Sequence, residues 1–338
     1  MAIDMAIPAG SLALVTGASG YTGQVLVRKL CALGFRVRAI ARPSSNIEPL
    51  AELPIEWIRG EVHDRDVVRR SCEGVEYLFH VAAAYREPGI EDETYRAVHV
   101  TSTEALAECL AGRPGFKRFV HVSTVGVHGH IDHPPASEDY RFSPGDIYQR
   151  TKAEAETWLR EFAVKSGLPV VVIRPAAIYG PGDKRLLKLF RLAGRRYFPL
   201  FGKSRGLYHL IHVDDLTDIF IVAALSPAAV GRVFIAGNPE PSSLKEIATV
   251  VSSELKGPPV RFIRLPAWPL FVAALLCEAA CKPLAISPPL YRRRVAFFTK
   301  DRAFDTSRLT RELKYRFSVP VEQGLRSTAR WYREAGWL

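Results

Sequence analysis

Cysteine is scarce in this sequence and is not arranged for cross-linking or metal binding. Five cysteines are scattered over 338 residues. None belongs to a CxxC pair, and no group of cysteines and histidines has the spacing of metal ligands. An odd number of scattered thiols argues against a disulfide framework and is typical of a reducing compartment. We therefore expect a cytoplasmic protein without a metal ion, whose free thiols are Cys31, Cys72, Cys109, Cys277 and Cys281.

Long basic runs and a secretion signal are also missing. The net charge is +11, yet the longest basic run covers residues 292–294. No module that combines aromatic and basic residues is visible, which argues against a nucleic-acid partner. The N-terminal residues MAIDMAIPAGS lack a charged segment followed by a long apolar core, so no signal peptide is expected. The excess positive charge therefore suits a solvated surface and a ligand that carries phosphate.

Near the start, an apolar strand, a glycine-rich turn and a helix follow one another. Residues 12–15 form a short apolar run, as expected for a parallel strand buried on both faces. Gly17, Gly20 and Gly23 follow at the spacing G-x-x-G-x-x-G, and residues 36–41 form a second apolar strand after the helix. Glycines let the backbone approach a pyrophosphate, and the helix N-terminus offers N–H groups to its charge. The unit predicts a dinucleotide site, with contacts from Gly17, Ser19, Gly20, Tyr21, Thr22 and Gly23.

Acidic residues are absent from the segment that is expected to contact the adenosine ribose. No Asp or Glu occurs between Asp4 and Glu48, whereas Arg38, Arg42 and serines at 44–45 lie in this window. A carboxylate here would bind the 2′-hydroxyl of NAD and would repel the 2′-phosphate of NADP, which arginine can grip in a bidentate manner. The composition therefore favours NADP over NAD, with Arg38 and Arg42 as its ligands.

Strands and helices alternate along most of the chain, which predicts one parallel sheet. Glu61 and Val62 come directly after the third strand, and Ala82 and Ala83 end the fourth. Small side chains at a strand's carboxyl end leave room for a flat cofactor, so these four residues are expected cofactor contacts. The predicted strands cover residues 12–15, 36–41, 55–60, 77–82, 117–123, 170–173 and 233–235.

The fold class that follows is α/β, a doubly wound parallel sheet of the Rossmann type with a smaller C-terminal α+β substrate lobe. We expect the dinucleotide-binding domain to cover residues 1–180, with residues 207–236 returning to it. The lobe would mainly comprise residues 181–206 and 237–338, where helices are predicted over 186–193 and 244–255.

A hydroxyl, a tyrosine and a lysine are placed for proton transfer. Ser123 and Thr124 stand at the end of one predicted strand, and Tyr148 and Lys152 lie four residues apart on one face of a predicted helix. A free tyrosine has a pKa of about 10, which is too high for an efficient base. A neighbouring ammonium lowers that pKa, and the hydroxyl orients the substrate oxygen. The set is typical of hydride transfer at an alcohol or carbonyl carbon.

Six segments together resemble the extended short-chain dehydrogenase/reductases of the NAD-dependent epimerase/dehydratase type. In layout the chain is most similar to the members that resemble 3β-hydroxysteroid dehydrogenases. The resemblance spans nearly the whole chain. The segments are TGASGYTG (16–23), HVSTVGVHG (121–129), YQRTK (148–152), RPAAIYGPGD (174–183), IHVDDL (211–216) and FDTSRLTRELKY (304–315).

The resemblance implies roles for individual residues. The family's catalytic hydroxyl lies five residues before the glycine that ends the second segment, which here selects Thr124 rather than Ser123. Tyr148 would be the acid/base, Lys152 would lower its pKa and hold the nicotinamide ribose, and Pro175 would lie beside the nicotinamide. A homodimer is also common among proteins that resemble this one.

The chain departs from the family pattern at two informative positions. His99 stands where the family has an asparagine that supports a proton-relay water. We expect a structural role for His99 and treat titration in a relay as the alternative. Tyr208 stands where nucleotide-sugar enzymes carry an arginine that grips the diphosphate, although Arg205 is near. A tyrosine cannot replace the guanidinium fork, which weakens the nucleotide-sugar hypothesis.

The most apolar stretch, residues 266–284, is too short for a transmembrane helix and is interrupted by Glu278. We expect a helix packed on the lobe. The alternative is a lipid- or substrate-facing helix, with peripheral membrane contact through residues 266–294, which include a basic segment suited to anionic headgroups.

The sequence therefore predicts an NAD(P)-dependent oxidoreductase that interconverts a secondary alcohol and a ketone by hydride transfer. A bulky apolar substrate, similar to a sterol or an isoprenoid, is expected. Two alternatives stay open: a nucleotide-sugar epimerase or dehydratase, and a redox-silent NADP-binding regulatory protein on the same fold.

Overall fold

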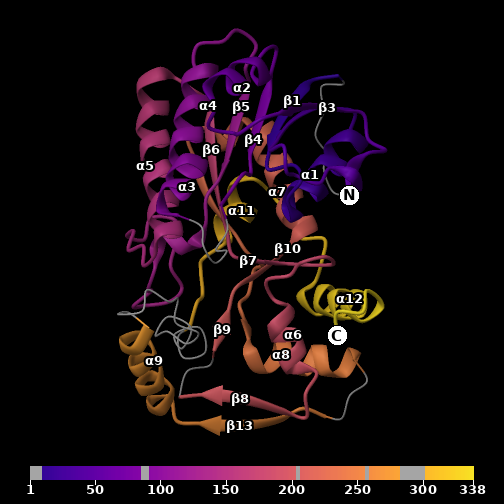
Figure 1. Cartoon of the computed structure of the whole chain (residues 1–338), viewed down its shortest axis with the longest axis vertical. Coiled ribbons are helices and arrows are strands. Elements are labelled where there is room, and N and C mark those ends of the chain that lie inside the picture. The colour runs from indigo at the N-terminus through magenta and orange to yellow at the C-terminus, as the bar shows by residue number, and fades with distance from the viewer. Residues whose placement is uncertain (1–9, 85–90, 203–205, 256–258, 282–300) are drawn as a thin grey trace.

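A seven-stranded parallel sheet forms the centre of the molecule (Figure 1), which confirms the predicted fold class. The computed structural model describes residues 10–84, 91–202, 206–255, 259–281 and 301–338. The chain winds outward from β1 in both directions, so the sheet has a topological switch point between β1 and β4. In spatial order the strands are β11 (Val233–Ala236), β6 (Val170–Pro175), β5 (Arg118–Val122), β4 (Tyr77–His80), β1 (Leu12–Thr16), β2 (Arg36–Ala41) and β3 (Ile55–Arg59).

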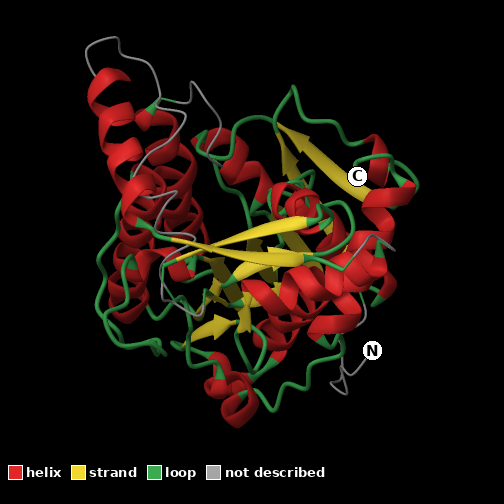
Figure 2. Cartoon of the chain, turned by 90° about the horizontal axis from the view of Figure 1, so that it is seen from below, coloured by secondary structure: helices red, strands yellow, loops and turns green. Residues whose placement is uncertain are grey.

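Apolar residues on alternate positions of each strand bury both faces of the sheet. In β1, Ala13 and Val15 join one core cluster and Leu12 and Leu14 join another, as the period of a strand requires. Helices cover the strands on both sides (Figure 2). One face carries α1 (Tyr21–Ala32), α7 (Val213–Leu225) and α11 (Ser307–Glu312), and the other carries α2 (Arg65–Ser71), α4 (Ser102–Leu110) and α5 (Ile147–Ser166).

The helix α5, which carries Tyr148 and Lys152, has well-defined ends. Asp146 caps its N-terminus by accepting a hydrogen bond from the Gln149 amide at 2.8 Å, and Gly167 ends it with φ +72°. The helix before it in the chain is less regular. It runs from α3 (Asp92–Arg96) through a π-helical turn, η2 (Ala97–Thr101), into α4. Such turns often mark functional sites, and this one contains His99.

The C-terminal lobe has a core of its own, to which Phe190, Ile247, Leu325 and Tyr332 contribute. Three small two-stranded sheets accompany it. The helices are α6 (Leu187–Ala193), α8 (Leu244–Glu254) and α12 (Val321–Glu334). The strand pairs are β7 (Ala177–Tyr179) with β10 (Leu210–His212), β9 (Leu207–Tyr208) with β12 (Ser242–Ser243), and β8 (Tyr197–Phe201) with β13 (Arg261–Leu265). Of these lobe elements, the sequence predicted α6 and α8, and it predicted neither α12 nor the strands. Short 3₁₀ turns are η1 (Glu48–Leu50), η3 (Val125–His128) and η4 (Pro227–Ala229).

The C-terminal segment contacts both halves of the molecule. Leu309 and Tyr315 belong to the core of the main sheet, although the sequence placed most of residues 237–338 in the lobe. Asp215 on α7 holds this segment: its carboxylate accepts hydrogen bonds from the Tyr315 hydroxyl at 2.7 Å and from the Ser318 amide at 2.8 Å. After this return to the sheet, α12 packs into the lobe core.

The helix α9 (Trp268–Cys281) lies at the lower edge of the molecule (Figure 1). Among its side chains Ala274 alone is buried, whereas Trp268 is 68% exposed and Leu276 is 64% exposed. The expectation that an apolar face of this helix packs on the lobe is therefore wrong for most of its length. No helix among the described residues is long and apolar enough to cross a membrane. The remainder of the apolar and basic stretch, residues 282–294, lies outside the described residues.

Candidate active site

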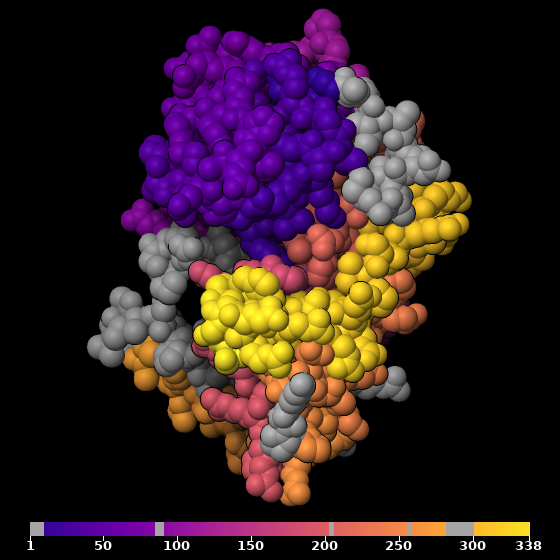
Figure 3. All heavy atoms as spheres, turned by 90° about the vertical axis from the view of Figure 1, so that its right-hand side faces the viewer, coloured from indigo at the N-terminus to yellow at the C-terminus, as the bar shows by residue number. Residues whose placement is uncertain are grey.

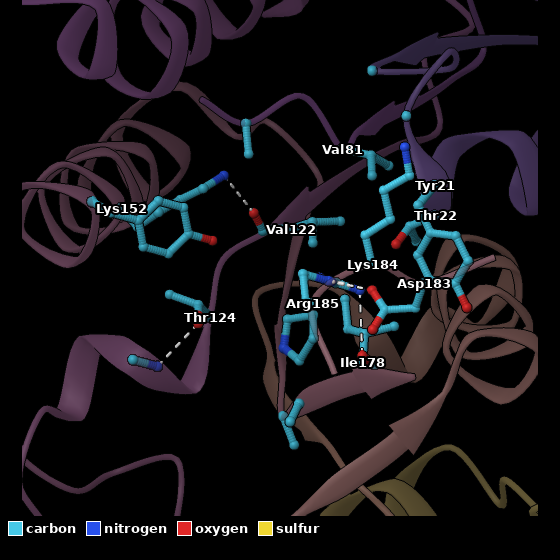
Figure 4. Close-up of a pocket in the computed structure, with 18 of the residues that line it drawn as sticks. Tyr21, Thr22, Val81, Val122, Thr124, Lys152, Ile178, Asp183, Lys184 and Arg185 are labelled. Atoms are coloured by element: carbon cyan, nitrogen blue, oxygen red, sulfur yellow. Dashed lines mark hydrogen bonds and ion pairs between the residues drawn. The ribbon is translucent and has the colours of Figure 1, made fainter. Parts of the chain in front are cut away.

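A cleft of about 1910 Å³ opens beyond the carboxyl ends of the sheet strands (Figure 4), and residues of α6 also line it. Parallel strands all present their carboxyl ends at this edge, so residues from distant parts of the sequence meet here. Of the predicted site residues, Arg38 is missing from the cleft. Those that line it are Gly17, Ser19, Gly20, Tyr21, Thr22, Gly23, Arg42, Glu61, Val62, Ala82, Ala83, Thr124, Tyr148, Lys152 and Pro175.

The glycine turn after β1 has the shape of a dinucleotide cradle. Gly17 has φ +73°, and a Cβ atom there would lie 2.8 Å from the Ala82 backbone. A Cβ on Gly23 would lie 2.1 Å from the carbonyl oxygen of Gly17. Gly20 caps α1, whose first turn contains no acidic residue. The backbone is thus free to approach a pyrophosphate, and the N–H groups and dipole of α1 would hold it.

A buried hydrogen-bond network fixes the strand ends that form the floor of the cleft. The Thr16 hydroxyl accepts from the Ala82 amide at 3.2 Å and donates to Nδ1 of His80 at 2.8 Å. The other ring nitrogen of His80 then carries the hydrogen and donates to the Thr103 hydroxyl at 3.1 Å. Burial lowers the pKa of His80 to about 3, so this ring stays neutral. The network ties β1 and β4 together where the cofactor would lie.

Arg38 is a correction to the predicted site. Its guanidinium pairs with Glu56 at 2.9 Å and donates to the carbonyl oxygens of Ser71 and Glu73 at 3.0 and 2.6 Å. The physical reason is its place in the middle of β2, because the cleft lies beyond the carboxyl end of the strand. Arg42 directly follows that end and does line the cleft.

Ser45 joins Arg42 in the cleft wall. The Arg59 guanidinium supports the loop that carries both residues, since it donates to the carbonyl oxygens of Arg42 at 3.1 Å and Ser45 at 3.3 Å. A second arginine, Arg28, donates to the carbonyl oxygen of Pro49. The loop thus presents the Arg42 guanidinium while its own backbone is held by neighbouring arginines.

Thr124, Tyr148 and Lys152 meet at the other end of the cleft. Lys152 is 1% exposed, and its Nζ donates to the carbonyl oxygen of Val122 at 2.9 Å (Figure 4). Burial lowers the pKa of Lys152 to about 7. Tyr148 precedes it by one turn of α5. Thr124 caps η3, and its hydroxyl oxygen accepts from the Gly126 amide at 3.0 Å, which fixes that oxygen at the cleft wall.

His99 holds the helix of the tyrosine and lysine in place. Its Nε2 accepts from the Ala84 amide at 3.0 Å, so Nδ1 must carry the hydrogen and donate to the Thr151 hydroxyl at 2.8 Å. Burial lowers the pKa of His99 to about 2, and its ring packs edge-on against Tyr148, with centroids 5.3 Å apart. A ring with a fixed tautomer and a low pKa supports the structural interpretation over a titrating relay.

A buried ion pair that sequence reasoning missed attaches α5 to the sheet. Arg174, at the end of β6, directs Nε to Glu156 of α5 at 3.1 and 3.2 Å. Its Nη1 donates to the carbonyl oxygen of Glu138 at 2.6 Å and contacts Nε2 of His128 at 3.1 Å. Both members of the pair are fully buried. No local pattern signals such a pair, because its members lie 18 residues apart on different elements.

Sequence reasoning also missed a basic wall on the lobe side of the cleft. Lys184, Lys188, Arg191 and Arg195 all line it, and their spacing is that of one helical face. The residues before and along α6 therefore carried a detectable signal. Among the described lining residues the carboxylates are Glu61, Asp183 and Asp301, so cations predominate. Apolar lining comes from Val125, Ile131, Leu189, Leu192, Phe271 and Phe304.

The parallel sheet, the glycine cradle and the tyrosine–lysine helix define an enzyme that uses a nicotinamide dinucleotide, of the short-chain dehydrogenase/reductase class. The chain belongs to the NAD-dependent epimerase/dehydratase family, whose model matches residues 13–237. It is an extended member of that class. Members of the family bind NAD(H).

Several known proteins are similar over nearly the whole of this chain. Sterol demethylase protein B of Methylococcus capsulatus is 30% identical, with 96% of this chain and 99% of that protein aligned. The 2-alkyl-3-oxoalkanoate reductase of Stenotrophomonas maltophilia is 28% identical, with 93% and 97% aligned. The 3beta-hydroxysteroid-dehydrogenase/decarboxylase isoform 2 of Arabidopsis thaliana is 28% identical, with 93% and 61% aligned. The crystal structure of gox2253 superposes with a TM-score of 0.81 at 26% identity, covering 97% of this chain and all of that one.

Proposed function

We propose that this protein interconverts a secondary alcohol and a ketone on a bulky substrate, with a nicotinamide dinucleotide as the redox partner. The observation that carries the proposal is the placement of Lys152. This lysine is fully buried, lies one helical turn from Tyr148 and donates to the carbonyl oxygen of Val122. It therefore does not serve as a solvated surface charge. Its position at the edge of the dinucleotide cleft suits proton transfer at a reacting carbon.

In this proposal each residue has a separate task. The bound nicotinamide supplies or accepts the hydride. Thr124 donates its hydroxyl hydrogen to the substrate oxygen, because its oxygen already accepts from the Gly126 amide. Tyr148 gives a proton to that oxygen during reduction and removes one during oxidation. The Lys152 ammonium stabilises the tyrosinate, and its pKa of about 7 leaves it able to exchange protons near neutrality.

We further propose NADP as the preferred cofactor. Arg42 and Ser45 supply a guanidinium and a hydroxyl to the cleft wall beyond β2, where the adenosine ribose is held in this fold. No carboxylate occurs in the sequence between Asp4 and Glu48. The Arg42 guanidinium would neutralise a 2′-phosphate and would have little to bind on a 2′-hydroxyl.

The proposed substrate is a bulky apolar molecule that also carries an anionic group. Apolar side chains such as Ile131, Phe271 and Phe304 suit the body of the molecule, and the basic wall at Lys188 and Arg195 suits the anion. The names of two relatives support the same class, since an oxoalkanoate is a keto acid and a decarboxylase acts on a carboxylate. A sterol- or isoprenoid-like 3-hydroxy or 3-oxo acid meets both requirements.

The central test is substitution of Tyr148 by phenylalanine. We expect Tyr148→Phe to lower turnover of a keto acid by about a thousandfold, because general acid–base catalysis contributes on this scale, while NADPH affinity stays unchanged. Tyr197→Phe is the matched control, since Tyr197 is half-exposed and lies outside the lining of the cleft. Turnover by Tyr148→Phe at the wild-type rate would refute the proposed chemistry. A redox-silent regulatory protein would likewise keep its activity in this variant.

A nucleotide-sugar epimerase or dehydratase is the second candidate, because the basic wall would also bind a diphosphate. Such an enzyme regenerates its cofactor within each turnover and retains it. Mass spectrometry of the purified protein under native conditions distinguishes the two. Freely exchanging NADPH supports the oxidoreductase, and tightly retained NAD⁺ supports the epimerase or dehydratase.

Peripheral membrane contact through α9 belongs to the same proposal. Leu275 and Leu276 are exposed on this helix, and the exposed Arg261 and Arg264 on β13 complement anionic headgroups. Sedimentation with phosphatidylserine vesicles should fall for the Leu275→Glu/Leu276→Glu variant and stay unchanged for Val164→Glu, which alters an exposed residue of α5. Equal sedimentation of all three proteins would exclude this contact.

The homodimer stays a prediction, which light scattering after size-exclusion chromatography tests.

A further inference from the structure

Two of the five cysteines lie against each other on the sheet face opposite α1. Cys72 directly follows α2, and Cys109 lies on α4, which packs against α2. Cys72 is completely buried, whereas Cys109 is partly exposed. The two thiols lie near enough to interact with each other. Neither residue lines the cleft, so the proposed catalysis does not account for this pair.

Arg113 joins both cysteines through its guanidinium. Its Nη2 donates to Sγ of Cys109 at 3.2 Å, and its Nη1 donates to the carbonyl oxygen of Cys72 at 2.9 Å. The contact with Cys72, together with the charges of Arg113 and Arg69, lowers the pKa of Cys109. The same contact and burial raise the pKa of Cys72. Cys109 is therefore the thiolate of the pair, and Cys72 is the thiol that faces it.

The geometry points to a reversible dithiol–disulfide site formed by Cys72 and Cys109, whose oxidant is a peroxide. The Cys109 thiolate attacks the O–O bond of hydrogen peroxide, which gives a sulfenic acid and releases hydroxide, protonated to water. The Cys72 sulfur then attacks the Cys109 sulfur, loses its proton, and displaces the sulfenic oxygen as a second water. In total, two thiols and one peroxide give one disulfide and two waters, with two electrons passed to the peroxide.

The other cysteines lack this arrangement and provide internal controls. Cys31 is half-buried, and burial raises its pKa. Cys277 and Cys281 also interact with each other along α9, but burial and their mutual contact raise the pKa of Cys281. None of the three accepts a hydrogen bond from an arginine within the described part of the chain. Proximity of two thiols is thus common to both pairs, and the guanidinium of Arg113 distinguishes the pair formed by Cys72 and Cys109.

The test is peroxide oxidation of the reduced full-length protein at pH 7, followed by alkylation and peptide mass spectrometry. We expect a peptide pair linked through Cys72 and Cys109 to form about ten times faster than any oxidised product of the other three cysteines. The rate of alkylation of Cys109 by iodoacetamide should level off at a lower pH than that of Cys31, which should still rise at pH 9. Thioredoxin or dithiothreitol should restore both thiols.

Three variants separate the steps. Cys72→Ser should stop oxidation at a Cys109 sulfenic acid that dimedone traps, and Cys109→Ser should leave Cys72 reduced. Arg113→Gln should slow oxidation of Cys109 and move its alkylation profile to higher pH. Circular dichroism checks that each variant is folded. The inference is overturned if Cys109 reacts no faster than Cys31, or if it oxidises without forming a bond to Cys72.

Discussion

The two walls of the cleft are built by different means. On the sheet side, backbone geometry and buried groups form the wall: Gly17 and Gly23 have no room for a side chain, and Lys152 is fully buried. On the lobe side, the exposed side chains include Lys188 on α6 and Arg195, the second residue after the end of that helix. A wall fixed by steric exclusion accepts one ligand shape, whereas a wall of flexible side chains can change its ligand by substitution. The comparison indicates that the cofactor is the constant partner and that the substrate side is the adaptable one.

The substitution Gly23→Ala is expected to disturb the sheet-side wall of the cleft most strongly. Because the new Cβ would lie 2.1 Å from the carbonyl oxygen of Gly17, the turn must move. We expect NADPH affinity to fall by at least two powers of ten, about 3 kcal/mol, in a fluorescence titration. Gly145→Ala is the control in the same cleft, since its Cβ would meet Gln149 at an ordinary 3.5 Å. Wild-type affinity in Gly23→Ala would show that the turn is not rigid.

The buried pair behind the same wall offers the next largest effect. Glu156→Gln leaves the Arg174 guanidinium buried without a countercharge, so the free energy of unfolding should fall by about 3 kcal/mol in urea denaturation. Glu312→Gln removes the partner of half-exposed Arg232 and should cost less than about 1 kcal/mol. Equal losses in the two variants would mean that Arg174 is solvated or bound by other groups.

The buried ring of His99 makes the stability of the folded protein depend on pH. Its pKa is about 2 in the folded protein and about 6.5 in the unfolded chain. Between these values the unfolded chain binds a proton that the folded protein excludes, so stability is complete above about pH 6.5 and decreases below it. From pH 7 to pH 5, the wild type should lose about 2 kcal/mol more than His99→Asn. Parallel pH profiles would instead indicate that His99 takes up a proton without unfolding.

The two arginines of β2 and its following loop test where cofactor selectivity resides. Arg42→Ala should weaken NADPH binding about tenfold and leave NADH binding unchanged, because a charge-assisted contact to the 2′-phosphate is lost. Arg38→Ala should preserve the ratio of the two affinities, since Arg38 binds Glu56 and backbone carbonyls instead. A change of that ratio in Arg38→Ala would reverse this assignment.

The smallest effects are expected on the lobe side. Lys188→Ala and Arg195→Ala should each raise the KM for a keto acid about threefold, because an exposed charge pair contributes less than about 1 kcal/mol. The KM for the methyl ester of the same keto acid and the affinity for NADPH should stay unchanged. If the two variants raised the KM for the acid and for the ester alike, Lys188 and Arg195 would not bind the substrate carboxylate.

The features that the sequence predicted correctly depend on residues that are close together in the chain. The glycine spacing, the buried strands and the tyrosine–lysine pair depend on residues a few positions apart, and the structure places them as expected. Arg38 was misplaced because composition within a window ignores how far along a strand each residue lies. The β8–β13 pair was not foreseen, since its strands are distant in sequence and β8 contains Pro199. The link between Arg174 and Glu156 depends on tertiary packing, which no periodicity encodes.

The path of the C-terminal segment has a consequence for how the protein is made. The yellow C-terminal residues lie between the indigo sheet domain and the orange lobe (Figure 3), and they complete both cores through Leu309 and Tyr332. During synthesis the glycine turn and the strands of the sheet emerge first, and α7 can pack on α1 and the sheet, but the Asp215 carboxylate meets Tyr315, Ser318 and Val319 only when that segment follows. The contacts through which this segment joins the sheet domain to the lobe therefore form last, after both walls of the cleft have been synthesised.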